Sequence, residues 1–178
     1  MSDTDVIKSY SDALRLGIYS RSIEEAYMIE GRLFEVFYTS PSIASGGTFA
    51  VGVLTGVKQA TYIPATISTS ADSVTMELFE GAVVTGGAAL TAWNHNMNLS
   101  IVPTSVVKTA PTITTIGTLI AKSYIGGVSG NPQSRQGDMD SGGYKIMLKP
   151  NTQYVFRFTN GSTAANILNV RSEWIESV

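Results

Sequence analysis

The chain has 178 residues and a formal net charge of -2. Only 15% of its residues are charged, whereas a typical soluble domain has about 25%. This length fits one domain with its own core, and sparse charge suits a subunit that packs among others. The basic residues are scattered, which disfavours nucleic acid as a partner. The absence of cysteine excludes disulfides and thiolate chemistry.

Two membrane-related signals are missing from the sequence. The N-terminal run MSDTDVIKSY lacks the basic and apolar blocks of a secretory signal. No segment approaches the roughly 18 consecutive apolar residues of a transmembrane helix. We therefore expect no membrane partner and synthesis in the host cytoplasm.

The first thirty residues carry the helix signals of the chain. Ser11 and Asp12 can cap a short helix, and Ser22 with Glu25 has the spacing of a capping box. Helices of about two turns are marginal alone in water, so we expect residues 1–30 to form an arm that becomes ordered on a partner. The apolar anchors of this arm would be Leu14, Leu16, Ile18, Ile23, Tyr27 and Ile29.

From Gly31 onward the residue pattern is that of strands. Runs rich in β-branched and aromatic residues alternate with clusters of Gly, Pro and Ser, and no helix of 10 to 15 residues intervenes. The sequence therefore predicts an all-β, antiparallel β-sandwich over residues 31–178, with a jelly roll as the leading topology. We expect strands over 32–38, 48–55, 60–68, 73–80, around Val102 and Val107, and over 115–125, 144–150, 153–160 and 165–176.

The C-terminal segments show the clearest alternation. The Pro-Asn-Thr run ending at Thr152 predicts a tight turn, and we expect the last two strands to form a central hairpin. Apolar residues that share one face of their strands should form the core. They are Phe34, Met76, Leu78, Leu148, Tyr154, Phe156, Phe158, Leu168, Val170 and Trp174.

Few residues suggest chemistry. His95 is the only histidine and has no recognisable nucleophile motif nearby, so we expect a hydrogen-bonded loop residue, no enzyme, no cofactor and no metal. Asp138 and Asp140 resemble half of a calcium loop, but solvated carboxylates are the simpler interpretation. The loop 126–143 around them is long enough to be either functional or mobile.

Trp93 is the more ambiguous aromatic residue. It stands among asparagines, and it either anchors a loop or is an exposed contact residue. We therefore take Trp93, Asn94 and Asn96 as candidate partner contacts beside the anchors of the arm.

Three sequence segments carry a resemblance to a known family. They are ELFEGAVVTGGAALTAWNHNMN at 77–98, LKPNTQYVFRFTN at 148–160, and Glu173 with Trp174. Over roughly residues 26–176 the chain resembles tailed-bacteriophage virion structural proteins, described as head decoration, cement or minor capsid proteins. His95, Met97 and Ile175 depart from the family pattern.

The resemblance implies a specific role. It implies a non-enzymatic cement protein on the virion surface that binds the major capsid protein as a homo-oligomer, a dimer or trimer, and stabilises the assembled head. A scaffold can host other roles, however. Trp93 and the loop 126–143 leave open a receptor- or glycan-binding module of a head fibre or tail.

Overall fold

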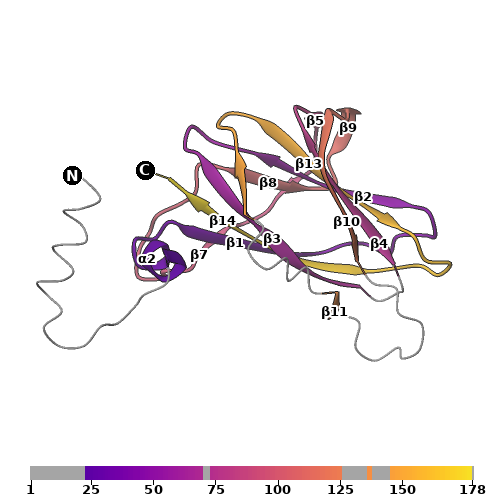
Figure 1. Ribbon diagram of the computed structural model, residues 1–178, viewed down its shortest axis with the longest axis horizontal. Coiled ribbons are helices and arrows are strands. Elements are labelled where there is room, and N and C mark those ends of the chain that lie inside the picture. The colour runs from indigo at the N-terminus through magenta and orange to yellow at the C-terminus, as the bar shows by residue number, and fades with distance from the viewer. Residues whose placement is uncertain (1–22, 70–72, 126–135, 138–144, 178) are drawn as a thin grey trace, which may run out of the picture.

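A computed structural model describes residues 23–69, 73–125, 136–137 and 145–177. It confirms the antiparallel β-sandwich (Figure 1). The expected contacts Leu14, Leu16 and Ile18, and the acidic pair Asp138 and Asp140, lie outside the described residues.

Two six-stranded sheets make up the sandwich. Sheet A contains β1 (Leu33–Thr39), β3 (Ala60–Thr69), β7 (Trp93–Asn94), β11 (Gln136–Gly137), β12 (Ile146–Leu148) and β14 (Leu168–Glu176). Sheet B contains β2 (Thr48–Leu54), β4 (Val74–Glu80), β6 (Ala88–Ala89), β8 (Val106–Thr109), β10 (Thr118–Ile125) and β13 (Gln153–Asn160). A small third sheet pairs β5 (Val83–Thr85) with β9 (Thr112–Thr115).

The strand pairing is that of a jelly roll. The first long strand, β1, pairs with the last, β14, and β2 pairs with β13. Further inward, β3 pairs with β12 and β4 pairs with β10. This nesting alternates β1 to β4, and again β12 to β14, between the two sheets around one core. The expected topology is therefore confirmed.

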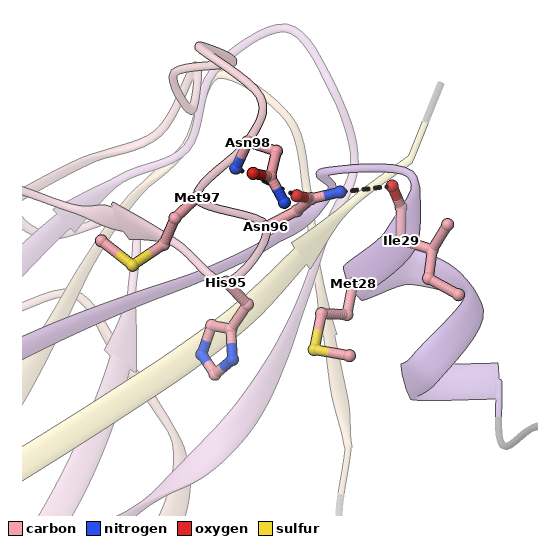
Figure 2. Close-up of a pocket in the computed structure, with 6 residues that line it drawn as sticks. All are labelled: Met28, Ile29, His95, Asn96, Met97 and Asn98. Atoms are coloured by element: carbon pink, nitrogen blue, oxygen red, sulfur yellow. Dashed lines mark hydrogen bonds between the residues drawn. The ribbon is translucent and has the colours of Figure 1, made fainter.

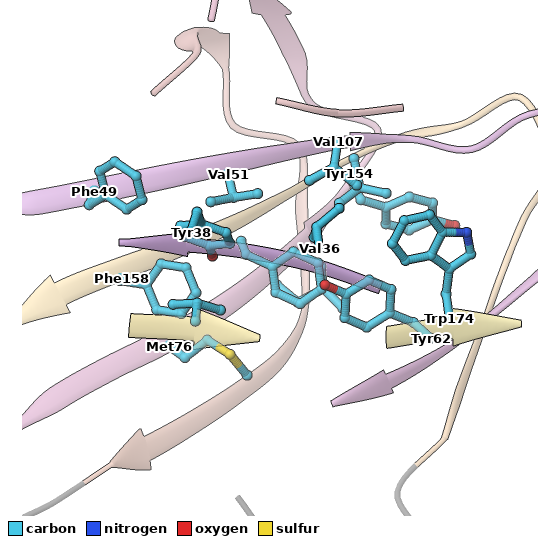
Figure 3. Packing of buried hydrophobic residues seen from close by; sticks show 14 of the residues in the cluster. Val36, Tyr38, Phe49, Val51, Tyr62, Met76, Val107, Tyr154, Phe158 and Trp174 are labelled. Atoms are coloured by element: carbon cyan, nitrogen blue, oxygen red, sulfur yellow. The ribbon is translucent and has the colours of Figure 1, made fainter. Parts of the chain in front are cut away.

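The core lies between the inner faces of the two sheets (Figure 3). All ten residues that the sequence assigned to the core are buried. Aromatic pairs join the sheets: Tyr62 of β3 stacks on Phe156 of β13 with ring centroids 4.9 Å apart. Within sheet A, Phe34 and Trp174 are cross-strand partners with centroids 5.9 Å apart. The alternation of the strands therefore directs their large apolar residues into one cluster.

One expectation about the strands is wrong and another needs a new boundary. The last two strands form no hairpin, because β13 belongs to sheet B and β14 to sheet A. The loop between them follows Asn160, the last residue of β13. The buried side chain of Asn160 donates hydrogen bonds to the carbonyls of Ile43 and Ala164. The predicted strand 115–125 is confirmed as β10 except at its start, because Gly117, with a φ of 82°, separates β10 from β9.

Several details refine the remaining expectations. The tight turn is confirmed, since Asn151 has a φ of 50° between β12 and β13. Val107 lies in β8, but Val102 lies outside any strand and is exposed. Val155 points away from the core and is nevertheless fully buried. Its cross-strand partner Gly52 lies close to Val84 and Pro111, which belong to the β5–β9 region covering this part of sheet B.

The second helix signal of the sequence is confirmed as α2 (Ile23–Ile29). The helix ends at Gly31, which has a φ of 70° and whose N–H donates to the carbonyl of Met28. Figure 1 shows α2 at one end of the sandwich, beside β7 and the start of β1. The sequence-predicted arm therefore joins the sandwich beside β7, the edge strand of sheet A.

Candidate functional site

The short strand β7 brings Trp93 onto the outer face of sheet A. Trp93 pairs with Glu35 of β1, and Glu35 pairs on its other side with Glu173 of β14. Two residues further along β1, Phe37 pairs with Arg171 of β14. Since the alternate residues of β1 and β14 fill the core, these five side chains share the opposite face.

Two aromatic side chains on this face are open to solvent. Trp93 is 56% exposed and Phe37 is 59% exposed. They stand at diagonal positions of neighbouring strands, a spacing at which large side chains lie side by side. Large aromatic residues of this sandwich are otherwise mostly buried, so this exposed pair is a candidate contact surface.

A network of charges lies between and beside the two rings. Arg171 Nη2 is 2.9 Å from Glu35 Oε2, and the same nitrogen contacts Glu173 Oε1. The guanidinium carbon of Arg171 lies 5.6 Å from the centre of the Phe37 ring. Each charged group is thereby held in a defined position, with Arg171 and Glu173 partly exposed and Glu35 buried.

His95 joins this network from the loop after β7. Its backbone N–H donates to the carbonyl of Leu33, and its Nε2 lies 2.8 Å from Glu35 Oε2. That close contact lacks hydrogen-bond geometry, so Nε2 is buried without a hydrogen-bond partner. The second carboxylate oxygen, Glu35 Oε1, is also buried without one. The sequence predicted a hydrogen-bonded loop residue, and it missed the carboxylate beside the imidazole.

Two carboxylates and an imidazole in this cluster are of the types that bind metal ions. Glu35, His95 and Glu173 can each present one ligand atom, all within 4.8 Å of one another. Carboxylate and imidazole together suit Zn²⁺. The guanidinium of Arg171, however, contacts both carboxylates and supplies the positive charge between them. The arrangement is therefore that of an ion-pair network rather than a metal centre.

The side chains of Asn94 and Asn96 make hydrogen bonds to the backbone of their own chain. The amide of Asn94 donates to the carbonyls of Gly31 and Ile101, and the amide of Asn96 donates to the carbonyl of Ile29. Their side-chain oxygens accept backbone N–H groups two residues further along. These asparagines fasten the loop to the end of α2, a role that the sequence did not predict for them.

A shallow pocket of about 390 Å³ lies between α2 and this loop (Figure 2). His95 and Met28 extend into the space between the two segments, and Met97 lies at its edge. Asn96 bridges the two walls through its hydrogen bond to Ile29. His95 therefore belongs both to the charge network and to the pocket lining.

Apolar side chains are exposed around the same end of the sandwich. Met97 and Val102 are each 80% exposed, and Leu99 and Ile101 reach toward Gly31. We call this group the end patch, and its members are Ile29, Met97, Leu99, Ile101 and Val102. Of the arm residues expected to make contacts, Tyr27 is partly buried with Arg32 stacked on its ring at 4.7 Å. Ile23 opens α2.

A second polar cluster near this end is structural. The carboxylate of Glu176 accepts hydrogen bonds from the backbone N–H groups of Thr104 and Ser105, and from the Trp174 indole. Burial alone would raise its pKa, but the hydrogen bonds outweigh burial and lower the pKa of Glu176. This carboxylate fixes the end of the exposed loop to the last strand.

Neither known protein families nor characterised proteins give a match to this sequence. Within the described residues, no helix is long and apolar enough to cross a membrane.

Proposed function

We propose that the protein is a non-enzymatic structural subunit of a tailed-phage particle, a decoration or cement protein that binds the major capsid protein. The observation that carries this proposal is the end patch. It exposes large apolar side chains at the point where the N-terminal segment enters the sandwich.

The end patch has the properties of a contact surface. Contiguous exposed apolar side chains mark interaction sites in soluble proteins. Asn94 and Asn96 hold its loop against α2, and Glu176 holds the chain that follows, so these side chains are presented on a fixed backbone. Pre-organised loops lose little entropy on binding, which favours a contact made many times over a particle surface.

The identity of the partner rests on the sequence resemblance. The segments that resemble virion proteins include 77–98, the region around Met97, although Met97 itself departs from the family pattern, and the expected docking arm of residues 1–30 contains α2. A capsid-binding arm and the end patch would then act together on one neighbouring subunit. A homo-oligomer would multiply this contact by avidity.

The test is the occupancy of phage heads by designed variants. Met97→Asp places a charge in the end patch, and we expect it to lower co-sedimentation with undecorated heads by about tenfold or more. Met147→Asp is the matched control, because Met147 is 71% exposed and lies on β12, which pairs with β3 at the opposite edge of sheet A from β7. Equal binding of both variants would refute the role of the end patch, and failure of the wild-type chain to bind heads would refute the proposed function.

A further inference from the structure

We propose that the outer face of sheet A around Trp93 and Phe37 is a binding site for a neutral oligosaccharide. This inference goes beyond capsid binding and does not require it: the pocket shares Ile29 and Met97 with the end patch, so the whole site is open in the free protein. The site comprises the two exposed rings, the charged groups Arg171 and Glu173, and the pocket that begins at His95.

The first argument is the chemistry of the exposed groups. The C–H face of a sugar ring packs on an aromatic face, and its hydroxyls need fixed donors and acceptors at the ring's edge. Trp93 and Phe37 supply two aromatic faces at neighbouring positions. Arg171 supplies donors and Glu173 an acceptor, and their mutual ion pair holds both in place beside the rings.

The second argument is the charge of the face. Arg171 is the only guanidinium or ammonium of this network, and it is already paired with two carboxylates, Glu35 and Glu173, so the network has no free cationic group to offer an acidic sugar. An anionic sugar would meet the exposed carboxylate of Glu173 without an unpaired cation to bind it, whereas a neutral sugar needs no such cation. The ligand class is therefore a neutral glycan.

The third argument is the extent of the apolar surface. Two large aromatic side chains bury roughly 150–250 Å² each when fully covered. A stable protein interface needs roughly 800 Å² from each partner. The neighbouring positions on this face carry Thr39 and Asn169, which are hydrogen-bonded to each other. The face is thus too polar and its aromatic area too small for a second protein, but it suits a ligand of a few sugar rings.

The pocket extends the site. Trp93 is the cross-strand partner of Glu35, and His95 Nε2 lies 2.8 Å from the Glu35 carboxylate, so His95 adjoins the same face; it also lines the pocket of about 390 Å³ beside α2. This volume lies in the range of small-ligand sites, roughly 300–1,000 Å³. An oligosaccharide stacked on the two rings could therefore place its next sugar at His95 and Met28.

The experiment is a glycan array probed with the full-length labelled chain, followed by calorimetric titration of the strongest neutral oligosaccharide. We expect Trp93→Ala and Phe37→Ala each to weaken binding about tenfold or more. Tyr124→Ala is the matched control, because Tyr124 is an aromatic residue 75% exposed on β10 of the other sheet. It should bind within about twofold of the wild type.

Thermal unfolding of each variant separates loss of binding from loss of folding. Trp93→Phe keeps an aromatic ring and should retain part of the affinity, which a variant that merely unfolds would not show. The inference is overturned if no neutral glycan binds, if only acidic glycans bind, or if Trp93→Ala binds as tightly as the wild type. Binding that Tyr124→Ala abolishes would place the site on the other sheet and would overturn it too.

Discussion

The two faces of sheet A use the same strands for different ends. On the inner face, Phe34 of β1 and Trp174 of β14 are each 1% exposed and pack against one another. On the outer face, their chain neighbours Glu35 and Glu173 form the ion-pair network, and Trp93 of β7 is 56% exposed. Strand alternation therefore gives the two faces different properties. The inner residues are fixed by packing, whereas the outer face carries the ion-pair network and leaves Trp93 and Phe37 exposed to solvent.

The two tryptophans of the chain give the largest expected contrast. Trp174→Ala removes the largest fully buried side chain and should lower the free energy of unfolding by about 3–5 kcal/mol. Trp93→Ala should change it by no more than about 0.5 kcal/mol, because that ring is mostly exposed. Urea unfolding monitored by circular dichroism measures both. Similar losses in the two variants would erase the distinction between the faces.

Glu176 tests how the exposed loop is tied to the inner face. Glu176→Gln replaces a carboxylate that accepts hydrogen bonds from Thr104 and Ser105 with an amide whose NH₂ group must face one of those donors. The free energy of unfolding should fall by about 2–3 kcal/mol. Hydrogen exchange at Thr104 and Ser105 should become faster. A variant as stable as the wild type, with unchanged exchange, would show that the carboxylate is dispensable.

Gly31 marks the boundary between α2 and the sandwich, and Gly81 offers a matched control. Both have φ near 70°, where an alanine costs about 1–2 kcal/mol. A Cβ on Gly31 would also come within 2.7 Å of Leu99 Cδ1, whereas one on Gly81 would meet nothing within 4 Å. Gly31→Ala should therefore be the less stable of the two variants in thermal unfolding. Equal stability would mean that Leu99 moves aside without cost.

The smallest expected effect is a pH dependence on the outer face of sheet B. The hydrogen bond from Arg157 holds the pKa of Glu77 below its ordinary value. Because the folded pKa lies below the unfolded value of about 4.3, this contribution is complete above that pH and is lost as the pH falls through the folded pKa. Between pH 5 and 3, as approximate limits, Glu77→Gln should show a shallower loss of stability than the wild type. Parallel curves would exclude Glu77 as a contributor.

The sandwich and its core could be predicted from the sequence because large apolar residues recur at every second position of the long strands. In β13, Tyr154, Phe156 and Phe158 reveal the inner face without any knowledge of their partners. The hairpin prediction failed for a related reason: alternation reports which face is buried, but not which strand lies alongside. That depends on Asn160 turning the chain from one sheet to the other.

The candidate site was predictable only in part. The sequence pointed to Trp93, but its neighbours are set by the register of a two-residue strand against β1, which carries no periodic signal. Glu35 and Glu173 are 138 positions apart and meet only because the first and last long strands pair. The partner contacts expected of Asn94 and Asn96 stay a prediction, and the sequence missed that their amides hold α2 against the loop.

The central claim is the proposed place of this chain on a phage head, and a cryo-EM reconstruction of virions from a phage whose genome carries this sequence tests it most directly. We expect sandwich-shaped density on the head surface, with α2 and Met97 directed at the capsid shell and the Trp93 face of sheet A turned to solvent. Virions that lack the chain, or in which the Trp93 face is buried against the shell while the end patch is free, would contradict it.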